Sequence, residues 1–168
     1  NIEYVKLSAL SVTPGASSVG TYIGNAAGLI AKILTTSVAE GSDPITLFVV
    51  YQNADGSAST NKAFSTSDAL TAKVWNTGTT SWDDGTVTGT VSSASATGTG
   101  TVCQIEDGIY FIRGQFVVVK ADTLVLSKYT SNVSFDVGLD ITESIVTSAE
   151  DATLNDNATG SPNYAAPG

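Results

Sequence analysis

Hydrophobic and polar residues alternate with a period of two along most of the chain, which is the pattern of half-buried β-strands. The first run, Ile2–Leu10, places Ile2 and Tyr4 on one side and Val5 and Leu7 on the other. Asp and Asn residues next to Gly or Pro interrupt these runs and predict turns between the strands. Further strands are predicted at Val19–Ile23, Ile45–Tyr51, Lys73–Trp75, Val102–Ile105, Ile109–Lys120, Thr123–Ser127 and Ser134–Ile141.

One stretch, Asn25–Thr35, fits two patterns. Its residues Ala26, Leu29, Ile30 and Ile33 recur at helical spacing, and a helix is therefore one interpretation. A central Gly and the β-branched pair at the end of the stretch disfavour a helix. A strand, with or without a bulge, is the preferred interpretation.

The segment from residue 102 onwards predicts a β-meander. The residues Glu106–Gly108 contain an Asp-Gly pair and are expected to form the turn of a hairpin, because this pair favours tight turns. In Ser134–Ile141, Phe135 and three aliphatic residues fall on one face, and Asp136 and Asp140 fall on the other. This alternation predicts an additional strand.

The expected fold is all-β, with two small antiparallel modules of barrel or sandwich type. The first module spans residues 1–82 and the second spans residues 102–147. A Ser/Thr/Gly-rich connector at 83–101 joins them, and its uncharged part, Gly85–Thr101, reads as strand and then loop. Residues 148–168 form an irregular tail, which predicts that the chain is part of a longer one.

Composition and charge exclude several classes of function. The chain has no His and one Cys, which excludes His-dependent nucleophile systems, imidazole-bound zinc and an internal disulfide. Its net charge of −9 argues against nucleic acid and anionic lipid as partners, because phosphate binding needs clustered Lys and Arg. No apolar run is long enough to span a membrane.

The polar residues are mostly uncharged. The chain contains 20 Ser and 23 Thr, while charged residues make up only 14% of it. With 42% hydrophobic residues the chain can bury a core, so the composition indicates a folded protein with a weakly charged surface. Such surfaces are typical of extracellular and virion β-proteins.

Adjacent carboxylates occur at Asp83-Asp84, Glu106-Asp107 and Glu150-Asp151. A glycosidase requires two carboxyl groups that face each other across a sugar, whereas neighbours on an extended chain point apart. We expect all three pairs to lie at turns as solvated residues, and no catalytic residue is predicted.

Three other features have a structural and a functional interpretation. The tail residues Asp151, Asn155, Asp156 and Asn157 offer oxygen ligands for calcium, but their spacing does not match an EF-hand, and capping of an irregular loop is preferred. Cys103 is expected to be a buried, inert thiol. Arg113, in an apolar strand, is expected to pair with Asp136 or Asp140. No cofactor is predicted.

Several motifs in the second half of the chain resemble a domain family of unknown function in large structural proteins of tailed bacteriophages, especially cyanobacterial myophages. They occur in the same order as in that family, and the residues Glu3–Leu7 (EYVKL) resemble the junction that precedes the region. The motifs are Glu106–Val119 (EDGIYFIRGQFVVV), Thr123–Tyr129 (TLVLSKY), Val137–Thr147 (VGLDITESIVT), Asp151–Asn157 (DATLNDN) and Gly160–Gly168 (GSPNYAAPG).

The resemblance implies a tail-fibre or baseplate-associated protein of the virion. We expect it to assemble as a homotrimer and with other tail proteins, and a host surface receptor is a further candidate partner. A secreted bacterial or archaeal adhesin or pilus subunit is the alternative, and a polysaccharide depolymerase is a third class. The residues expected to serve burial or assembly are Tyr110, Phe111, Arg113, Phe116, Phe135 and Tyr164.

Overall fold

The computed structural model describes residues 1–168 except 54–62, 158, 161, 163, 167 and 168. The protein is all-β, as predicted. Its described part divides into a first unit, Asn1–Phe135, and a second unit, Asp136–Gly168. This division differs from the predicted one, because most of residues 83–101 lie in two strands of the same sheet, Ser81–Val91 and Thr97–Ile105.

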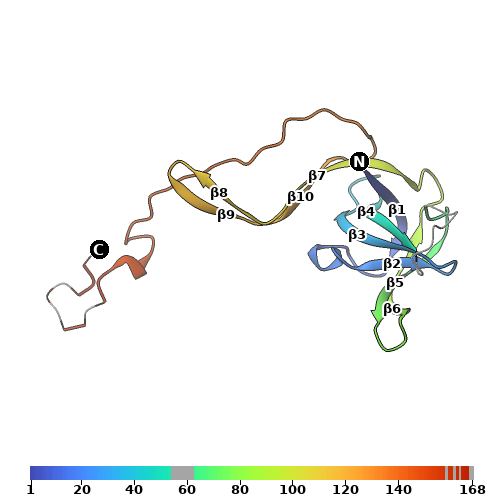
Figure 1. The fold of residues 1–168 in the computed structure, drawn as a ribbon, viewed down its shortest axis with the longest axis horizontal. Helices are drawn as coiled ribbons and strands as arrows, with labels where there is room; N and C mark the ends of the chain where they lie inside the picture. Colours follow the sequence, from blue (N-terminus) through green and yellow to red (C-terminus); the bar gives the residue numbers. More distant parts are fainter. Residues whose placement is uncertain (54–62, 158, 161, 163, 167–168) are drawn as a thin grey trace. The chain divides into compact units, whose positions relative to one another are not determined.

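The first unit is built on a six-stranded antiparallel barrel (Figure 1). Its strands are arranged in the order β1-β4-β3-β2-β5-β6, and pairing of β6 with β1 closes the barrel. Closure leaves the barrel strands without a long free edge. The strands are β1 (Ile2–Leu10), β2 (Tyr22–Asn25), β3 (Leu29–Ser37), β4 (Ile45–Asn53), β5 (Ala69–Asn76) and β6 (Ser81–Val91).

A seventh strand, β7 (Thr97–Ile105), continues along the edge of β1 that β6 occupies. The β6 strand pairs with Leu7–Leu10, and β7 pairs with Ile2–Val5. Between them the chain stays bonded to Lys6, whose N–H donates to Ala96 (2.7 Å) and whose carbonyl accepts from Ser92 (2.9 Å). The first strand of the chain is therefore bonded to three others.

The barrel interior is filled by one face of each strand. Val5 and Leu7 point inward, which confirms the alternation predicted for Ile2–Leu10. The other face of β1 carries Ile2 and Tyr4, which pack with Phe48 in a second buried cluster outside the barrel. The interior cluster consists of Val5, Leu7, Ile23, Leu29, Ala31, Ile33, Leu47, Val49, Phe64, Leu70, Val91 and Ala96.

The ambiguous stretch Asn25–Thr35 contains the β2–β3 turn and most of β3. The helix interpretation is wrong, and the bulged-strand interpretation is confirmed by the register shift between Ile33 and Thr35. Gly28 allows the turn because it adopts a φ of +86°. The side-chain oxygen of Asn25 accepts a hydrogen bond from the Leu29 N–H at 3.0 Å and orders the turn further.

The Gly/Thr-rich segment that was predicted to end as a loop contains a strand instead. Gly98 lies opposite Tyr4, and a Cβ atom at this position would lie 2.7 Å from the Tyr4 hydroxyl. A Cβ atom at Gly100 would lie 2.5 Å from the carbonyl oxygen of Lys128. The glycines therefore let an aromatic ring and a neighbouring backbone approach the sheet closely, a role of glycine within strands.

The predicted strand Ser134–Ile141 is not present as a paired strand, since the segment belongs to no sheet. Apolar and polar residues do alternate in this segment, but the apolar residues Phe135 and Leu139 are exposed. Hydrophobic alternation predicts a strand only where a neighbouring strand supplies hydrogen bonds. No such neighbour is found for this segment in the described part of the chain.

The second unit begins in this segment, and its described residues include one short 3₁₀ helix, η2 (Ala152–Leu154). Asp151 caps η2 by accepting a hydrogen bond from the Thr153 N–H at 2.9 Å. Further along, backbone bonds join Asp156 to Ala165 (2.7 Å) and Ala166 (2.8 Å). The unit is therefore held by local turns.

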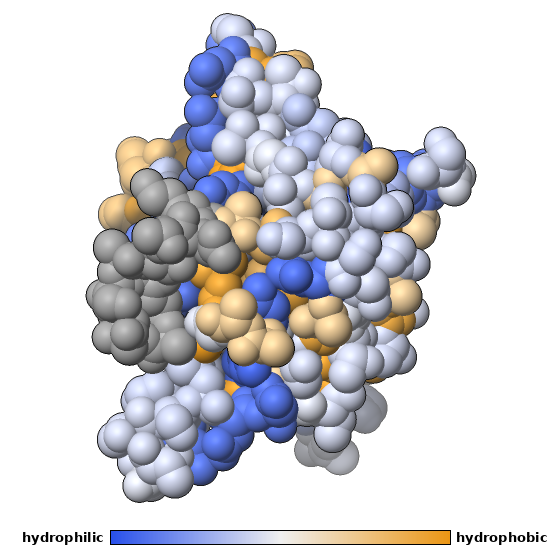
Figure 2. Space-filling model, turned by 90° about the vertical axis from the view of Figure 1, so that its right-hand side faces the viewer, coloured by the Kyte–Doolittle hydropathy of each residue, from blue (hydrophilic) through white to orange (hydrophobic). Residues whose placement is uncertain are grey.

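Hydrophilic and hydrophobic residues are mixed over the surface of the molecule. Most of the face drawn in Figure 2 is pale, the colour of residues with near-neutral hydropathy, with scattered hydrophilic and hydrophobic patches. Among the described residues, no helix has both the length and the hydropathy to cross a membrane.

Candidate assembly surface

A two-stranded ribbon is attached to the outside of the barrel. Its base consists of β7 and β10 (Asp122–Ser127), which pair antiparallel. Val102 and Val125 from this base pack against the outer cluster formed by Ile2, Tyr4 and Phe48. Because Phe48 is completely buried, the base is anchored to the barrel by apolar packing.

A polar cluster anchors the chain just after β10, and we call it the latch. It consists of Asp43, Thr46, Lys128 and Tyr129. Lys128 donates a hydrogen bond to the Asp43 carboxylate at 2.8 Å, and the Tyr129 hydroxyl donates to the other oxygen of the same carboxylate. The Tyr129 hydroxyl also bonds the buried Thr46 hydroxyl at 2.9 Å. The latch thus joins the residues after β10 to the start of β4.

The Tyr129 ring makes two further contacts, one with an aromatic ring and one with an ammonium group. Its ring meets that of Tyr4 edge to face at 5.0 Å between centroids. The Lys6 ammonium lies 3.7 Å from the Tyr129 ring centroid, which is a cation–π geometry. Tyr129 therefore links the apolar cluster to the charged latch.

The latch shifts the titration of its members. Hydrogen bonds from Lys128 and then from Tyr129 hold the pKa of Asp43 below its ordinary value. The bond to Asp43 raises the pKa of Lys128, and burial followed by the bond to Asp43 raises the pKa of Tyr129. All three shifts favour the charge state found at neutral pH, with Asp43 ionised and Tyr129 neutral.

Replacing Asp43 by Asn is expected to lower the free energy of unfolding by about 1 kcal/mol at pH 7. The loss is small because the two ionic side chains remain 27% and 32% exposed, and solvent screens them. Since the folded pKa of Asp43 is depressed, its contribution is present above its ordinary pKa and is lost as the pH falls through the folded value.

Urea unfolding of the wild-type chain and of Asp43→Asn at pH 7 and below pH about 3 measures this effect. The difference between the two proteins should shrink at the lower pH. The variant Asp140→Asn, at an exposed carboxylate of the second unit, is the control and should match the wild type. A difference in unfolding free energy that is the same at both pH values would contradict the stabilising role of the ionised Asp43 carboxylate.

Beyond the base, the ribbon continues as the hairpin of β8 (Gly108–Ile112) and β9 (Gln115–Val119), which form a sheet of two strands (Figure 1). Its turn is Arg113-Gly114, with φ values of +48° and +90°, the geometry of a two-residue type I′ turn. The predicted turn at Glu106–Gly108 is therefore wrong. There the ribbon only passes from one sheet to the next, and Asp107 accepts a hydrogen bond from the Ala121 N–H at 2.7 Å.

One face of this hairpin is entirely apolar, and we call it the hairpin face. The register places Ile109 opposite Val118 and Phe111 opposite Phe116, so the four side chains share one side. The two phenylalanine rings are in contact, with centroids 5.2 Å apart. The exposed fractions are 70% for Ile109, 67% for Phe111, 78% for Phe116 and 63% for Val118.

The reverse face of the hairpin is mostly apolar and better covered, with the polar Gln115 beside the turn. It includes Tyr110 and Val117, which are opposite each other and each 40% exposed. A hairpin of two strands is marginally stable by itself in water. Large apolar side chains are therefore exposed to solvent on both faces of the hairpin.

Four of the predicted assembly residues belong to the β8–β9 hairpin. Tyr110, Phe111 and Phe116 lie on the hairpin. Arg113 lies in its turn and not within a strand, because the two-residue turn needs positive φ values at this position. Phe135 ends the first unit, and Tyr164, also exposed, lies in the second.

The carboxylate pairs have local partners. Asp83-Asp84 lies within β6 and not at a turn, and Asp83 accepts a hydrogen bond from Asn76 at 2.7 Å. In the second unit, Glu150 accepts a hydrogen bond from the Thr147 N–H at 3.0 Å. These contacts give the carboxylates local structural roles.

The calcium candidates are arranged around local turns. Asp151 caps η2, Asn155 follows it, and Asp156 pairs with the backbone near Ala166. Asn157, the fourth candidate, has its carbonyl bonded to Thr159 at 2.7 Å. Within the part of the chain that is described, no group of three or more His, Cys, Asp or Glu side chains is placed to hold a metal ion.

Cys103 lies in β7 as predicted, but it is half-buried and not fully buried. It lies opposite Leu124 in the ribbon base, where only two strands cover the side chain. A ribbon of two strands has no closed interior, and full burial would require more layers.

The chain was compared with protein-family models, curated proteins and solved structures, and none of them matches it.

Proposed function

We propose that this protein is a non-enzymatic structural protein that assembles with copies of itself through its β8–β9 hairpin. The observation that carries the proposal is the hairpin face, where four large apolar side chains are each more than 60% exposed. A contiguous apolar patch without charge is a feature of protein interfaces.

Burial of this face would supply a substantial driving force. The two phenylalanines expose on the order of 200–350 Å² together, given a typical aromatic area of 150–250 Å². Burying that area is worth roughly 5–9 kcal/mol before the cost of association is subtracted. Association costs at least a few kcal/mol, so a stable assembly also needs the remaining apolar residues of the hairpin.

The two apolar faces favour a ring of copies over a pair. A symmetric dimer would bury the hairpin face twice and leave the reverse face open. In a ring, the hairpin face of one copy can pack on the reverse face of the next, and the contacts close. A homotrimer is the smallest ring of this kind, and we propose it as the assembly.

The place proposed for this assembly is the tail of a bacteriophage virion, in a fibre or baseplate-associated protein that also contacts other tail proteins. The sequence resemblance supports this setting. The exposed segment from Phe135 to Ile141, with its alternating apolar residues, provides additional surface for such contacts.

Sedimentation of the full chain over a range of concentrations tests the proposed self-association. The wild-type chain should form trimers at micromolar concentration. The double variant Phe111→Ser/Phe116→Ser should be monomeric, with association weakened about a hundredfold or more, because the centre of the interface is lost.

The matched control is Val12→Ser/Val38→Ser, which makes the same polarity change at two exposed valines outside the strands. It should assemble like the wild type. A wild-type chain that stays monomeric at about 100 µM, or a double variant that still forms trimers, would contradict the proposal.

The proposed location is tested by imaging the particle that contains the chain. Density for the chain in a phage tail supports the proposal. Its presence in a filament on a bacterial or archaeal cell surface would instead favour an adhesin or pilus subunit.

A further inference from the structure

A row of three aromatic rings lies at the β5–β6 end of the barrel, far along the sequence from the hairpin. We call Tyr22, Trp82 and Trp75 the aromatic row. The ring centroids of Tyr22 and Trp82 are 4.7 Å apart, and those of Trp82 and Trp75 are 5.3 Å apart. The row contains both tryptophans of the chain.

Strand register places the row on one face of the sheet. Trp75 lies opposite Trp82, and Tyr22 lies opposite Lys73, two residues before Trp75. Because side chains two residues apart share a face, all three rings point to the same side. The rings come from three adjacent strands, and each is therefore held by a sheet and not by a loop.

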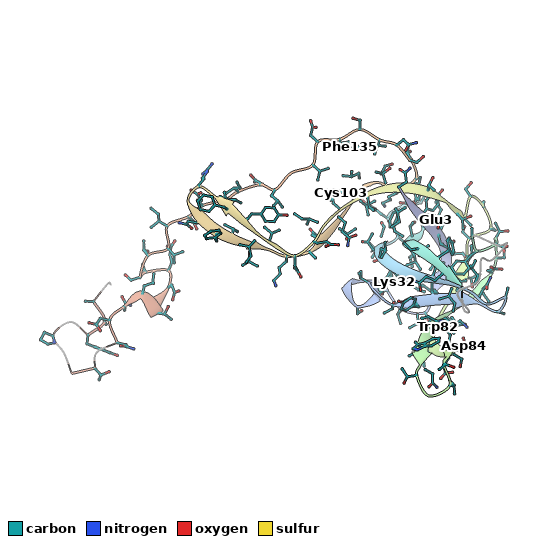
Figure 3. The ribbon with its side chains drawn as sticks, viewed as in Figure 1. Glu3, Lys32, Trp82, Asp84, Cys103 and Phe135 are labelled. Atoms are coloured by element: carbon teal, nitrogen blue, oxygen red, sulfur yellow. The ribbon has the colours of Figure 1, made fainter. Side chains whose placement is uncertain are left out.

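A polar pair borders the row on the same face. Lys73 lies opposite Asp84 and forms an ion pair with it. Asp84 is two residues from Trp82, and both are labelled in Figure 3. The Lys73 stem lies across Gly24, where a Cβ atom would be 2.9 Å from the Lys73 Cε. The missing side chain at Gly24 thus lets the lysine lie flat beside the rings.

The rings are accessible and their support is ordered. Trp75 is 45% exposed, and Tyr22 and Trp82 are half-buried. The turn after Trp75 is fixed by Asn76, whose side chain accepts a hydrogen bond from the Gly78 N–H at 2.9 Å and donates to Asp83 at 2.7 Å. A ligand would therefore meet rings that need little further ordering, which lowers the entropic cost of binding.

The chemistry of this surface selects among classes of ligand. Aromatic rings bordered by fixed hydrogen-bonding groups suit a ligand that is apolar on its faces and polar at its edges. A sugar ring has this character, with C–H groups on its faces and hydroxyls at its rim. The Lys73 charge is already paired, and Asp83 and Asp84 add negative charge to a chain of net charge −9, which disfavours anionic sugars.

We propose that the aromatic row is a binding platform for neutral oligosaccharides, with Lys73 and Asp84 bonding sugar hydroxyls at its edge. The row is separate from the hairpin face, and the inference does not rest on self-association. If the protein belongs to a phage tail, the platform supplies a contact to neutral glycans of the host surface.

Titration of the full chain with neutral gluco-, manno- and galacto-oligosaccharides, followed by tryptophan fluorescence, tests the proposal. Both tryptophans lie in the row, so binding of at least one sugar series should change their emission. Trp75→Ala should weaken binding about tenfold or more, and Trp82 remains as the reporter. Asp84→Asn, which keeps the rings, should weaken it about fivefold.

The matched control is Val74→Ala. Val74 neighbours Trp75 and is 59% exposed, but its side chain points to the other face of β5. Binding to this variant should equal that of the wild type. No change with any of the sugars at about 10 mM, equal binding by Trp75→Ala and the wild type, or a preference for anionic sugars would overturn the proposal.

Self-association and sugar binding can be tested separately. The variant Phe111→Ser/Phe116→Ser keeps the aromatic row and should retain sugar affinity for a single site. A monomeric wild-type chain that binds sugar would refute the assembly and leave the platform in place. A trimer that binds no sugar would support the assembly and refute the sugar-binding platform.

Discussion

Replacing Phe48 by Ala is expected to lower the free energy of unfolding by about 3–5 kcal/mol. Phe48 is completely buried at the centre of the outer cluster, between the barrel and the ribbon base. Its removal leaves a cavity that the closed barrel cannot collapse to fill, because its neighbours are fixed by strand pairing on both sides. A loss of this size is a large fraction of the stability of an ordinary domain.

Urea unfolding monitored by tryptophan fluorescence measures the change, because both tryptophans lie on barrel strands. Val50→Ala is the control, since Val50 lies on the same strand but is 45% exposed. It should lose less than about 1 kcal/mol. A loss of similar size for both variants would show that the cluster does not anchor the ribbon as described.

Replacing Gly100 by Ala is expected to destabilise the protein by about 2–3 kcal/mol. The added Cβ atom would meet the carbonyl oxygens of Lys128 at 2.5 Å and Ser127 at 2.7 Å. These are backbone atoms, so no side-chain rotation relieves the clash. The end of β10 must move away from β7, and Tyr129 and the latch move with it.

Hydrogen exchange distinguishes this local effect from general destabilisation. Amides of β7 and β10 should lose protection in Gly100→Ala more than amides of β3. The control Gly15→Ala places a Cβ atom in open space, with no heavy atom within 4 Å, and should exchange like the wild type. Uniform loss of protection over the whole barrel would contradict the predicted local effect.

The strands with clear alternation could be predicted from the sequence. The strands predicted at Ile2–Leu10 and from Ile45 onwards match the structure. Each has one face in the barrel interior and the other face in the outer cluster. The composition of the Thr/Gly segment around Gly98 predicts a loop, whereas the segment forms a strand that pairs with β1 and packs against Tyr4, far away in the sequence. Local composition carries no information about such a distant partner.

The candidate sites show a similar limit. The apolar run predicts a role for Phe111 and Phe116. The position of Arg113 depends on whether Asp107-Gly108 or Arg113-Gly114 forms the turn. Asp-Gly was the stronger turn signal, and Arg113-Gly114 is the turn because it pairs the apolar residues of β8 and β9 with each other.

The aromatic row was missed in the sequence. Trp75 and Trp82 lie equally far from the Gly78–Thr79 centre of their turn, and this symmetry predicts that they face each other across a hairpin. Tyr22 joins them through the β2–β5 pairing, which connects segments about 50 residues apart and has no local signal.

The pairing of β1 limits when the barrel can fold during synthesis. β1 is synthesised before the other strands of the barrel, but its partners β6 and β7 follow only after β5. One backbone edge of β1 therefore stays unpaired until these two strands have emerged. Contacts over such long separations slow folding. Closure of the barrel during synthesis therefore waits for β6, which pairs with β1.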